Sequence, residues 1–212
     1  MKTLVVATRN AHKLREIRAL LREVRDLRIV DPGDVGISPA PEEEEIEAFP
    51  TFQENALAKA RYFHERTGLM TVADDSGLEV DALDGLPGVR SKRFAPDAED
   101  RSPEEQDRAN IEHLLARLSD VDFGERTARF VCVAALVGGK QTPEFFRGTV
   151  DGLILGRPRG WEGFGYDPVF LDQASGRTFA EMTQEEKGAL SHRGRAFMKL
   201  AAYLVAIQKA ER

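Results

Sequence analysis

The sequence predicts an α/β fold in which helices pack around one twisted β-sheet. Two observations predict it. Short runs of β-branched and apolar residues, typical of strands, alternate along the chain with stretches whose apolar residues recur at helical spacing. The 212 residues are enough for one substantial core, and they contain no internal repeat, low-complexity segment or flexible linker. A chain of this length forms either one large domain or two closely joined lobes, and we favour one folding unit, a single domain over residues 1 to 212.

The N-terminal part is expected to begin with a strand over residues 2 to 8, "KTLVVAT", and a helix over residues 10 to 24. The apolar face of this helix comprises Leu14, Ile17, Leu20, Leu21 and Val24. A second helix starts near residue 54 and ends at Gly68, and the buried strand "LMTVAD" follows it and ends in paired aspartates. The acidic run "PEEEEIE" before this helix is expected to form a solvated loop or an edge.

In the C-terminal part, Ser102 and Glu105 have the spacing of a capping box, and Pro103 stands at the first helical position. They predict a helix that runs to about residue 118. Two long strands, over residues 127 to 139 and 144 to 155, then form a hairpin. Residues 156 to 168 contain too much glycine and proline for regular structure, and such loops often carry function. An amphipathic helix over residues 190 to 207 ends the chain.

Composition excludes several classes of protein. No apolar run reaches the roughly 18 residues that a membrane-spanning helix needs, and the N-terminus lacks the core of a signal peptide. We therefore expect a cytoplasmic protein without membrane contact. The net charge of −6 argues against nucleic acid as a partner but leaves room for a local basic pocket. The single cysteine, Cys132, lies in an apolar run and is expected to be a core residue.

Two segments that lead into predicted helices are candidate phosphate sites. In "ATRNAHK", Thr8 and Asn10 stand at a helix N-terminus, which attracts anions, and Lys13 lies one turn further on. The alternative is an ordinary helix cap with a surface lysine. In "TFQENALAKA", Asn55 and Lys59 share one helical face, and Lys59 is either a second phosphate ligand or an exposed lysine.

The paired aspartates Asp74 and Asp75 are a candidate catalytic or metal site. Adjacent carboxylates repel each other unless a cation or a hydrogen-bond donor compensates, and Mg²⁺ is the obvious cation. Along a strand the two side chains point to opposite faces, so only one of them faces a given pocket. In the alternative interpretation, the following "SG" forms a turn, and either aspartate has a purely structural role. Metal or catalytic use is the favoured interpretation.

Two further motifs are candidate base-binding sites. In "GFGYDPVF", the glycines allow the backbone to approach a ligand, and Phe164 and Tyr166 offer flat faces for stacking. The alternative is a rigid loop with buried aromatic rings. In "EEKGALSHRGRAF", Lys187, His192 and Arg193 surround an expected helix start and can donate to a carbonyl oxygen or a phosphate. A solvated basic turn is the alternative there.

Together the stretches "TRNAHK", "TFQENALAKA", "ADDSGLEVDALDGLPGV", "GFGYDPVF" and "EEKGALSHRG" resemble the inosine triphosphate pyrophosphatase family. These enzymes hydrolyse non-standard purine nucleoside triphosphates, namely ITP, dITP and XTP, to the monophosphate and pyrophosphate. The resemblance implies an elongated α/β fold with a long mixed sheet, two lobes and the nucleotide in a cleft between them. It also implies a homodimer and a requirement for Mg²⁺.

The resemblance also implies roles for individual residues. Asp75 is the catalytic proton acceptor and a metal ligand, with Asp74 in a supporting role. Glu47 is the second metal ligand, in a segment where Phe49 replaces a glycine of the family. The residues implied in substrate binding are Thr8, Arg9, Asn10, Ala11, His12, Lys13, Lys59, Ser76, Phe164, Gly165, Tyr166, Asp167, Lys187, His192 and Arg193.

Base specificity follows from donor patterns. Hypoxanthine and xanthine carry an oxygen at C6 that accepts hydrogen bonds from Lys187, His192 or Arg193, whereas adenine has a donor there, and such mismatches discriminate strongly. Phe164 is the predicted stacking platform, and Asp167 orients either the base or the pair of His192 and Arg193. Two alternatives stay open: a Maf-like pyrophosphatase that acts on other modified or ordinary nucleotides, and a nucleotide-binding module without hydrolysis.

Overall fold

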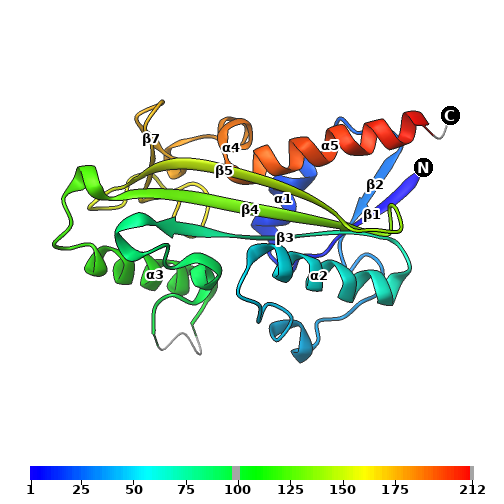
Figure 1. Ribbon diagram of the computed structural model, residues 1–212, viewed down its shortest axis with the longest axis horizontal. Helices are drawn as coiled ribbons and strands as arrows, with labels where there is room; N and C mark the ends of the chain where they lie inside the picture. The colour runs from blue at the N-terminus through cyan, green and yellow to red at the C-terminus, as the bar shows by residue number, and fades with distance from the viewer. Residues whose placement is uncertain (97–100, 211–212) are drawn as a thin grey trace. The chain divides into compact units, whose positions relative to one another are not determined.

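The computed structural model describes residues 1–96 and 101–210 (Figure 1). The described residues form a seven-stranded sheet in the order β2-β1-β3-β4-β5-β6-β7. The strands are β1 (Lys2–Val6), β2 (Leu27–Val30), β3 (Met70–Val80), β4 (Thr127–Val137), β5 (Glu144–Ile154), β6 (Phe170–Asp172) and β7 (Arg177–Thr178). Because β1 pairs in parallel with β2 and β3 while β6 pairs antiparallel with β5 and β7, the sheet is mixed. The predicted α/β class is confirmed.

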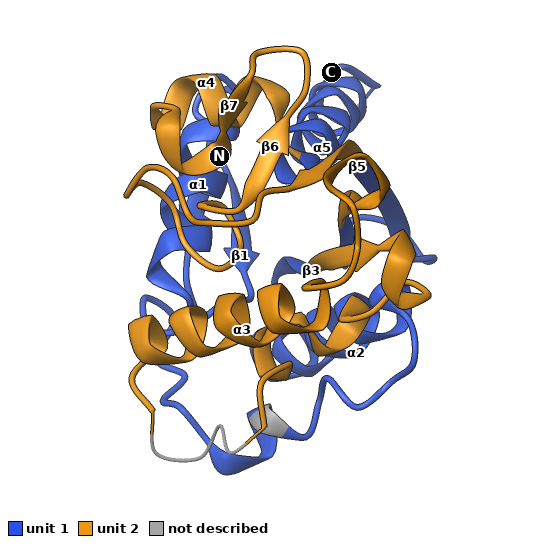
Figure 2. Cartoon of the chain, turned by 90° about the vertical axis from the view of Figure 1, so that its left-hand side faces the viewer, with its two compact units in different colours: residues 1–75, 132–148, 192–212 blue, residues 76–131, 149–191 orange. Residues whose placement is uncertain are grey.

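Five α-helices accompany the sheet in the described part of the chain. They are α1 (Ala11–Leu20), α2 (Phe52–Thr67), α3 (Pro103–Arg117), α4 (Gln184–Leu190) and α5 (His192–Ala210). None of the described helices is long and apolar enough to cross a membrane. The chain divides into two compact units (Figure 2): unit 1 comprises residues 1–75, 132–148 and 192–212, and unit 2 comprises residues 76–131 and 149–191. Strands β3, β4 and β5 contribute residues to both units. That the whole chain folds as a single unit stays a prediction.

The core of unit 1 lies on both faces of its strands. On one face, Val72 of β3 packs in a cluster with Ile17 of α1 and Phe197 of α5. On the other face, Ala73 packs in a cluster with Ala56 of α2. Figure 1 shows α5 and α2 on opposite sides of the strands. Because side chains alternate along a strand, Asp74 points to the same face as Val72, and Asp75 points to the same face as Ala73.

The core of unit 2 is built around aromatic side chains. Phe130 of β4 stacks on Phe179 with ring centroids 5.9 Å apart, and Phe170 of β6 contacts both rings. Helix α3 packs Ile111 and Leu114 into the same cluster. Between β5 and β6, residues 155 to 169 form neither helix nor strand, as the glycine and proline content predicted.

Several local predictions are confirmed, among them two helix ends and a hairpin. Ser102 and Glu105 form the capping box of α3, and Gly68 ends α2 with a positive φ of 65°. Strands β4 and β5 are sheet neighbours joined by a short connection, as predicted for a hairpin. The acidic run, in contrast, was expected to be a solvated loop or an edge, but it begins with a short 3₁₀ helix, Pro41–Glu44.

Other predictions are wrong in their boundaries. The aspartates do not end a strand, since β3 continues through them to Val80, and compensating side chains allow the charges to lie inside the strand. Helix α1 ends at Leu20 and not at residue 24. The predicted last helix corresponds to α5, which begins at His192 and runs to Ala210, whereas the short helix α4 before it was not predicted; Ser191 adopts an extended conformation between the two. The short strands β2, β6 and β7 were not predicted.

Candidate active site

The junction between β1 and α1 is an ordered helix cap in unit 1. The side-chain oxygen of Asn10 accepts hydrogen bonds from the backbone N–H groups of His12 and Lys13, at 2.9 and 3.0 Å. The hydroxyl of Thr8 accepts from the N–H of Asn10 at 3.2 Å. Asn10 is therefore the predicted cap, and the cap directs the first turn of α1 and its Lys13 toward β3.

Asp74 is the centre of a buried ionic cluster in unit 1. Its Oδ2 atom lies 3.2 Å from Nζ of Lys13 and 3.1 Å from a terminal nitrogen of Arg193. The other terminal nitrogen of Arg193 binds Glu16 of α1 at 2.6 Å. Cys132 donates to the same oxygen of Asp74 at 3.8 Å and is buried, as predicted for a core cysteine. Helices α1 and α5 are thus joined to β3 through charged groups.

The charges of this cluster stabilise one another. Burial by itself would raise the pKa of Asp74, but the cations of Lys13 and Arg193 outweigh burial and hold this pKa far below its usual value. Burial would lower the pKa of Arg193, but the carboxylates of Asp74 and Glu16 raise it. Asp74 is therefore ionised at every physiological pH, which suits a supporting residue and not a proton acceptor.

Asp75 lies in a different environment, on the side of the strand that faces α2. Its Oδ2 atom accepts a hydrogen bond of 3.0 Å from the side-chain amide of Asn55, and the residue is 7% exposed. Burial is the largest influence and raises the pKa of Asp75 to about 6. The charge of Lys13 opposes this rise, whereas the charge of Glu47 adds to it. A carboxylate with this pKa is ionised at neutral pH but basic enough to accept a proton.

Glu47 and Lys59 complete this part of unit 1. The ammonium group of Lys59 forms an ion pair with the carboxylate of Glu47 and also approaches the backbone carbonyl of Asp74, at 3.5 Å. Asn55 binds both backbone groups of Phe49, at 2.9 and 3.2 Å, and so holds the segment that carries Glu47 against α2. The phenylalanine at the family's glycine position is itself exposed.

The donor set fits a small hard cation. Among the described residues no group of three or more histidine, cysteine or acidic side chains is arranged to hold a metal. However, Mg²⁺ needs only one or two protein carboxylates, because waters and substrate phosphates supply its other ligands. Asp75 and Glu47 are such a pair, since the charge of Glu47 raises the pKa of Asp75. Glu47 already binds a cationic group, the ammonium of Lys59.

The other residues predicted in this region have varied surroundings. Arg9 makes a two-point ion pair with Glu43, at 2.7 and 2.9 Å, and donates to the carbonyl of Ile37. Ala11 and His12 are exposed in the first turn of α1, and Ser76 is half-buried in β3. The structure thus brings Lys13, Lys59 and Asp75 together with Glu47, whereas Arg9 is held by Glu43.

In unit 2, the candidate base-binding loop is held in a compact turn. The carboxylate of Asp167 accepts from the backbone N–H of Phe164 at 2.9 Å and from Nζ of Lys187 at 2.6 Å. Nζ of Lys187 also lies 4.8 Å from the centre of the Phe164 ring. Gly163 adopts a φ of 80°, and a Cβ atom there would collide with Asp167. Lys187, Asp167 and Phe164 therefore form one group, as their predicted roles require.

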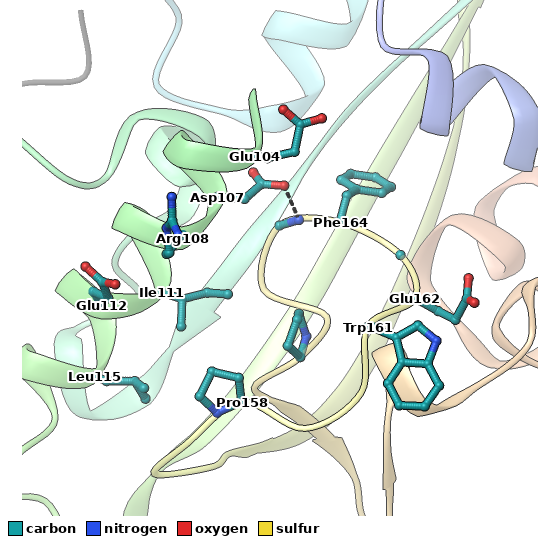
Figure 3. A pocket seen from close by; sticks show the side chains of 13 residues that line it. Glu104, Asp107, Arg108, Ile111, Glu112, Leu115, Pro158, Trp161, Glu162 and Phe164 are labelled. Atoms are coloured by element: carbon teal, nitrogen blue, oxygen red, sulfur yellow. Dashed lines mark hydrogen bonds between the residues drawn. The ribbon is translucent and has the colours of Figure 1, made fainter. Parts of the chain in front are cut away.

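Tyr166 has a different position from Phe164. Its ring is 4% exposed and its hydroxyl donates to the carbonyl of Ser91 at 3.0 Å, so it belongs to the core of unit 2. The ring of Phe164 is half-buried and lines an open cavity of about 520 Å³ together with α3 and Trp161 (Figure 3). Of the two predicted aromatic faces, Phe164 is the one available for stacking.

Lys187 belongs to unit 2, whereas His192 and Arg193 belong to unit 1 and are buried. Base binding by His192 and Arg193 stays a prediction. Sequence reasoning missed Glu16, which binds Arg193, and Asp107, which accepts from the backbone N–H of Gly165 at 2.6 Å. The spacing of Glu16 three residues after Lys13 was a usable signal, because residues three apart share a helix face.

Comparison with known proteins finds relatives over almost the whole chain. The model of the Ham1 family matches residues 4–203. A dITP/XTP pyrophosphatase of Frankia alni is 47% identical over 201 residues, which cover 94% of this chain and 96% of that protein. A dITP/XTP pyrophosphatase of Mycolicibacterium paratuberculosis is 47% identical over 99% of both chains. The solved structure of a HAM1 protein from Coxiella burnetii superposes with a TM-score of 0.82 at 36% identity, covering 97% of this chain and all of that one.

Proposed function

Because this chain belongs to the Ham1 family, we propose that it hydrolyses the non-standard purine nucleoside triphosphates ITP, dITP and XTP to the monophosphate and pyrophosphate. Its relatives named dITP/XTP pyrophosphatase support this choice of substrate. The observation that carries the proposal is the buried Asp75 carboxylate beside Glu47 and the ammonium groups of Lys13 and Lys59. A binding module without hydrolysis has no need of a proton acceptor among phosphate-binding lysines.

Hydrolysis at the α-phosphorus requires an attacking water, neutralisation of charge on phosphate oxygens and a leaving pyrophosphate held in line. Asp75 orients the water and accepts its proton, since its carboxylate is ionised above about pH 6. Asn55 donates to Oδ2 of Asp75 and keeps the carboxylate from rotating. Lys13 and Lys59 neutralise phosphate charge, and the capped N-terminus of α1 offers backbone N–H groups nearby.

Asp75 and Glu47 are the residues that would hold Mg²⁺. When bound, the ion supplies charge neutralisation at the phosphate oxygens. Glu47 is now paired with Lys59, so this lysine must be able to transfer from Glu47 to a phosphate when substrate enters. Lys59 thus compensates the carboxylate in the absence of ligand and the phosphate in its presence.

Base recognition is assigned to unit 2. The half-buried ring of Phe164 stacks on the purine, and Lys187 donates to the oxygen at C6. Asp167 holds the ammonium of Lys187 in place at 2.6 Å and so keeps a donor at this position. Adenine presents an amino donor to the same ammonium and is rejected, because two donors that face each other leave both groups unpaired.

Two further properties complete the proposal, and the first of them derives from the family resemblance. We propose a homodimer, which light scattering on the purified protein tests directly. We also propose that the protein works in the cytoplasm, where nucleotide precursors of replication and transcription are found, and a fluorescent fusion tests this.

The decisive experiment incubates the protein with Mg²⁺ and, separately, ITP, dITP, XTP, GTP and ATP while pyrophosphate and orthophosphate are measured. We expect pyrophosphate from ITP, dITP and XTP and little product from GTP or ATP; guanine shares the oxygen at C6, so its rejection must come from its 2-amino group. Orthophosphate as the first product would refute cleavage at the α-phosphorus. Equal rates on all five nucleotides would refute the base selectivity and favour the Maf-like alternative.

A further inference from the structure

The loop that carries Phe164 is tied to helix α3 by one short hydrogen bond. The backbone N–H of Gly165 donates to Oδ2 of Asp107 at 2.6 Å (Figure 3). This distance is at the short end for a nitrogen donor, as expected when the acceptor is a carboxylate. The contact joins residues 58 positions apart and lies next to the proposed stacking ring.

The backbone around Phe164 has little stiffness of its own. Gly163 and Gly165 flank it with φ values of 80° and 61°, which L-residues with a side chain rarely adopt. The bond from the N–H of Phe164 to Asp167 closes a turn within the loop, and Asp167 in turn binds Lys187 of α4 at 2.6 Å. The Asp107 contact attaches the backbone directly after Phe164 to another element.

Helix α3 is a firm support for this contact. Its N-terminus is closed by the Ser102 capping box, and its apolar face is buried through Ile111 and Leu114. Three residues after Asp107, Asn110 is 2% exposed and accepts from the backbone N–H groups of residues 94 and 95 at 3.1 and 2.9 Å. An acceptor on such a helix holds its position against thermal motion of the loop.

We infer that Asp107 is a positioning residue for base recognition: it fixes the backbone at Gly165 so that the Phe164 ring is presented to the purine. This inference rests on the proposed function, in which Phe164 stacks on the base. It predicts that Asp107 contributes to the use of substrates that have a base and not to the phosphate chemistry of Asp75, which belongs to unit 1.

The test compares ITP with ribose 5′-triphosphate, which carries the same phosphates but no base. In Asp107→Ala we expect kcat/KM for ITP to fall about tenfold or more, mainly through KM, since a hydrogen bond to a charged group is lost. The values for ribose 5′-triphosphate should stay within about twofold. Asp107→Asn should keep most of the wild-type kcat/KM for ITP, because its amide oxygen can accept the hydrogen bond from the N–H of Gly165. Glu112→Ala is the matched control, because Glu112 lies on the same helix and lines the same cavity.

The results distinguish a failure of the proposed base recognition from a failure of the positioning role of Asp107. If the wild-type protein uses both substrates equally well, the proposed base recognition is wrong. If the wild type prefers ITP and Asp107→Ala keeps the full preference, or if both substrates lose the same factor, the positioning role is wrong. Should Asp107→Ala fail to fold, Asp107→Glu keeps the charge but displaces the oxygen, and it must also lower the preference for ITP.

Discussion

Replacing Asp75 by asparagine should make the protein more stable while it removes activity. The two side chains have the same shape, and the oxygen of asparagine can still accept the hydrogen bond from Asn55. The substitution therefore removes the negative charge and little else. Because burial disfavours that charge in the folded state, its removal should raise the free energy of unfolding.

The magnitude follows from the pKa. The pKa of Asp75 rises from its ordinary value of 3.8 to about 6 in the folded protein. This difference of about two pKa units, at about 1.4 kcal/mol each, amounts to roughly 3 kcal/mol of lost stability at pH 7.5. The folded state holds the proton more tightly, so the loss grows as pH rises from about 4 to about 6 and then stays constant. At pH 4.5 the same relation leaves roughly 1 kcal/mol.

Thermal melting followed by circular dichroism, with EDTA and without nucleotide, measures this difference. For a chain of this size about 3 kcal/mol corresponds to an increase in Tm of roughly 6 to 12 °C at pH 7.5, and to a smaller increase at pH 4.5. The exposed Asp120→Asn is the control and should change Tm little at either pH. Added Mg²⁺ should stabilise the wild type more than the Asp75→Asn variant, which lacks one metal ligand.

Two results would refute the reasoning. An Asp75→Asn variant no more stable than the wild type at pH 7.5 would mean that the buried carboxylate is compensated in the free protein. An increase of equal size at both pH values would mean that it does not come from the ionisation of Asp75. In the same preparation kcat for ITP should fall about 100-fold or more, as for the loss of a general base. Near-normal turnover would remove Asp75 from the mechanism.

Three further substitutions test other parts of the structure. Arg193→Leu leaves the buried carboxylate of Asp74 without one of its cations and should destabilise the protein by about 3–5 kcal/mol in denaturant titrations. Tyr166→Phe removes the hydrogen bond to Ser91 and should cost about 1 kcal/mol of stability with kcat unchanged, since the hydroxyl is buried in the core. Lys187→Met should lower the ratio of kcat/KM for ITP to that for ATP at least about tenfold, measured by pyrophosphate release.

Local chemistry made several elements predictable. The caps of α1 and α3 depend on side chains that bond to backbone groups two or three residues away, so Asn10 and Ser102 could be identified by inspection. Gly68 ends α2 for an equally local reason, its positive φ. The end of β3 was not predictable in this way, because the local turn signal that follows Asp75 competes with contacts from distant segments.

The sequence by itself determined the α/β class, the helix caps and the family, because periodicity, capping and ordered motifs are properties of neighbouring residues. Only the tertiary structure decided which charges pair. Arg193 finds Asp74 across 119 residues and Glu16 across 177, while the adjacent Asp75 meets Asn55 on the opposite side of the strand. The physical reason is that the ionisation of a buried carboxylate depends on the groups that the fold places around it. Two neighbouring aspartates therefore acquire opposite pKa shifts, and only one of them is suited to accept a proton.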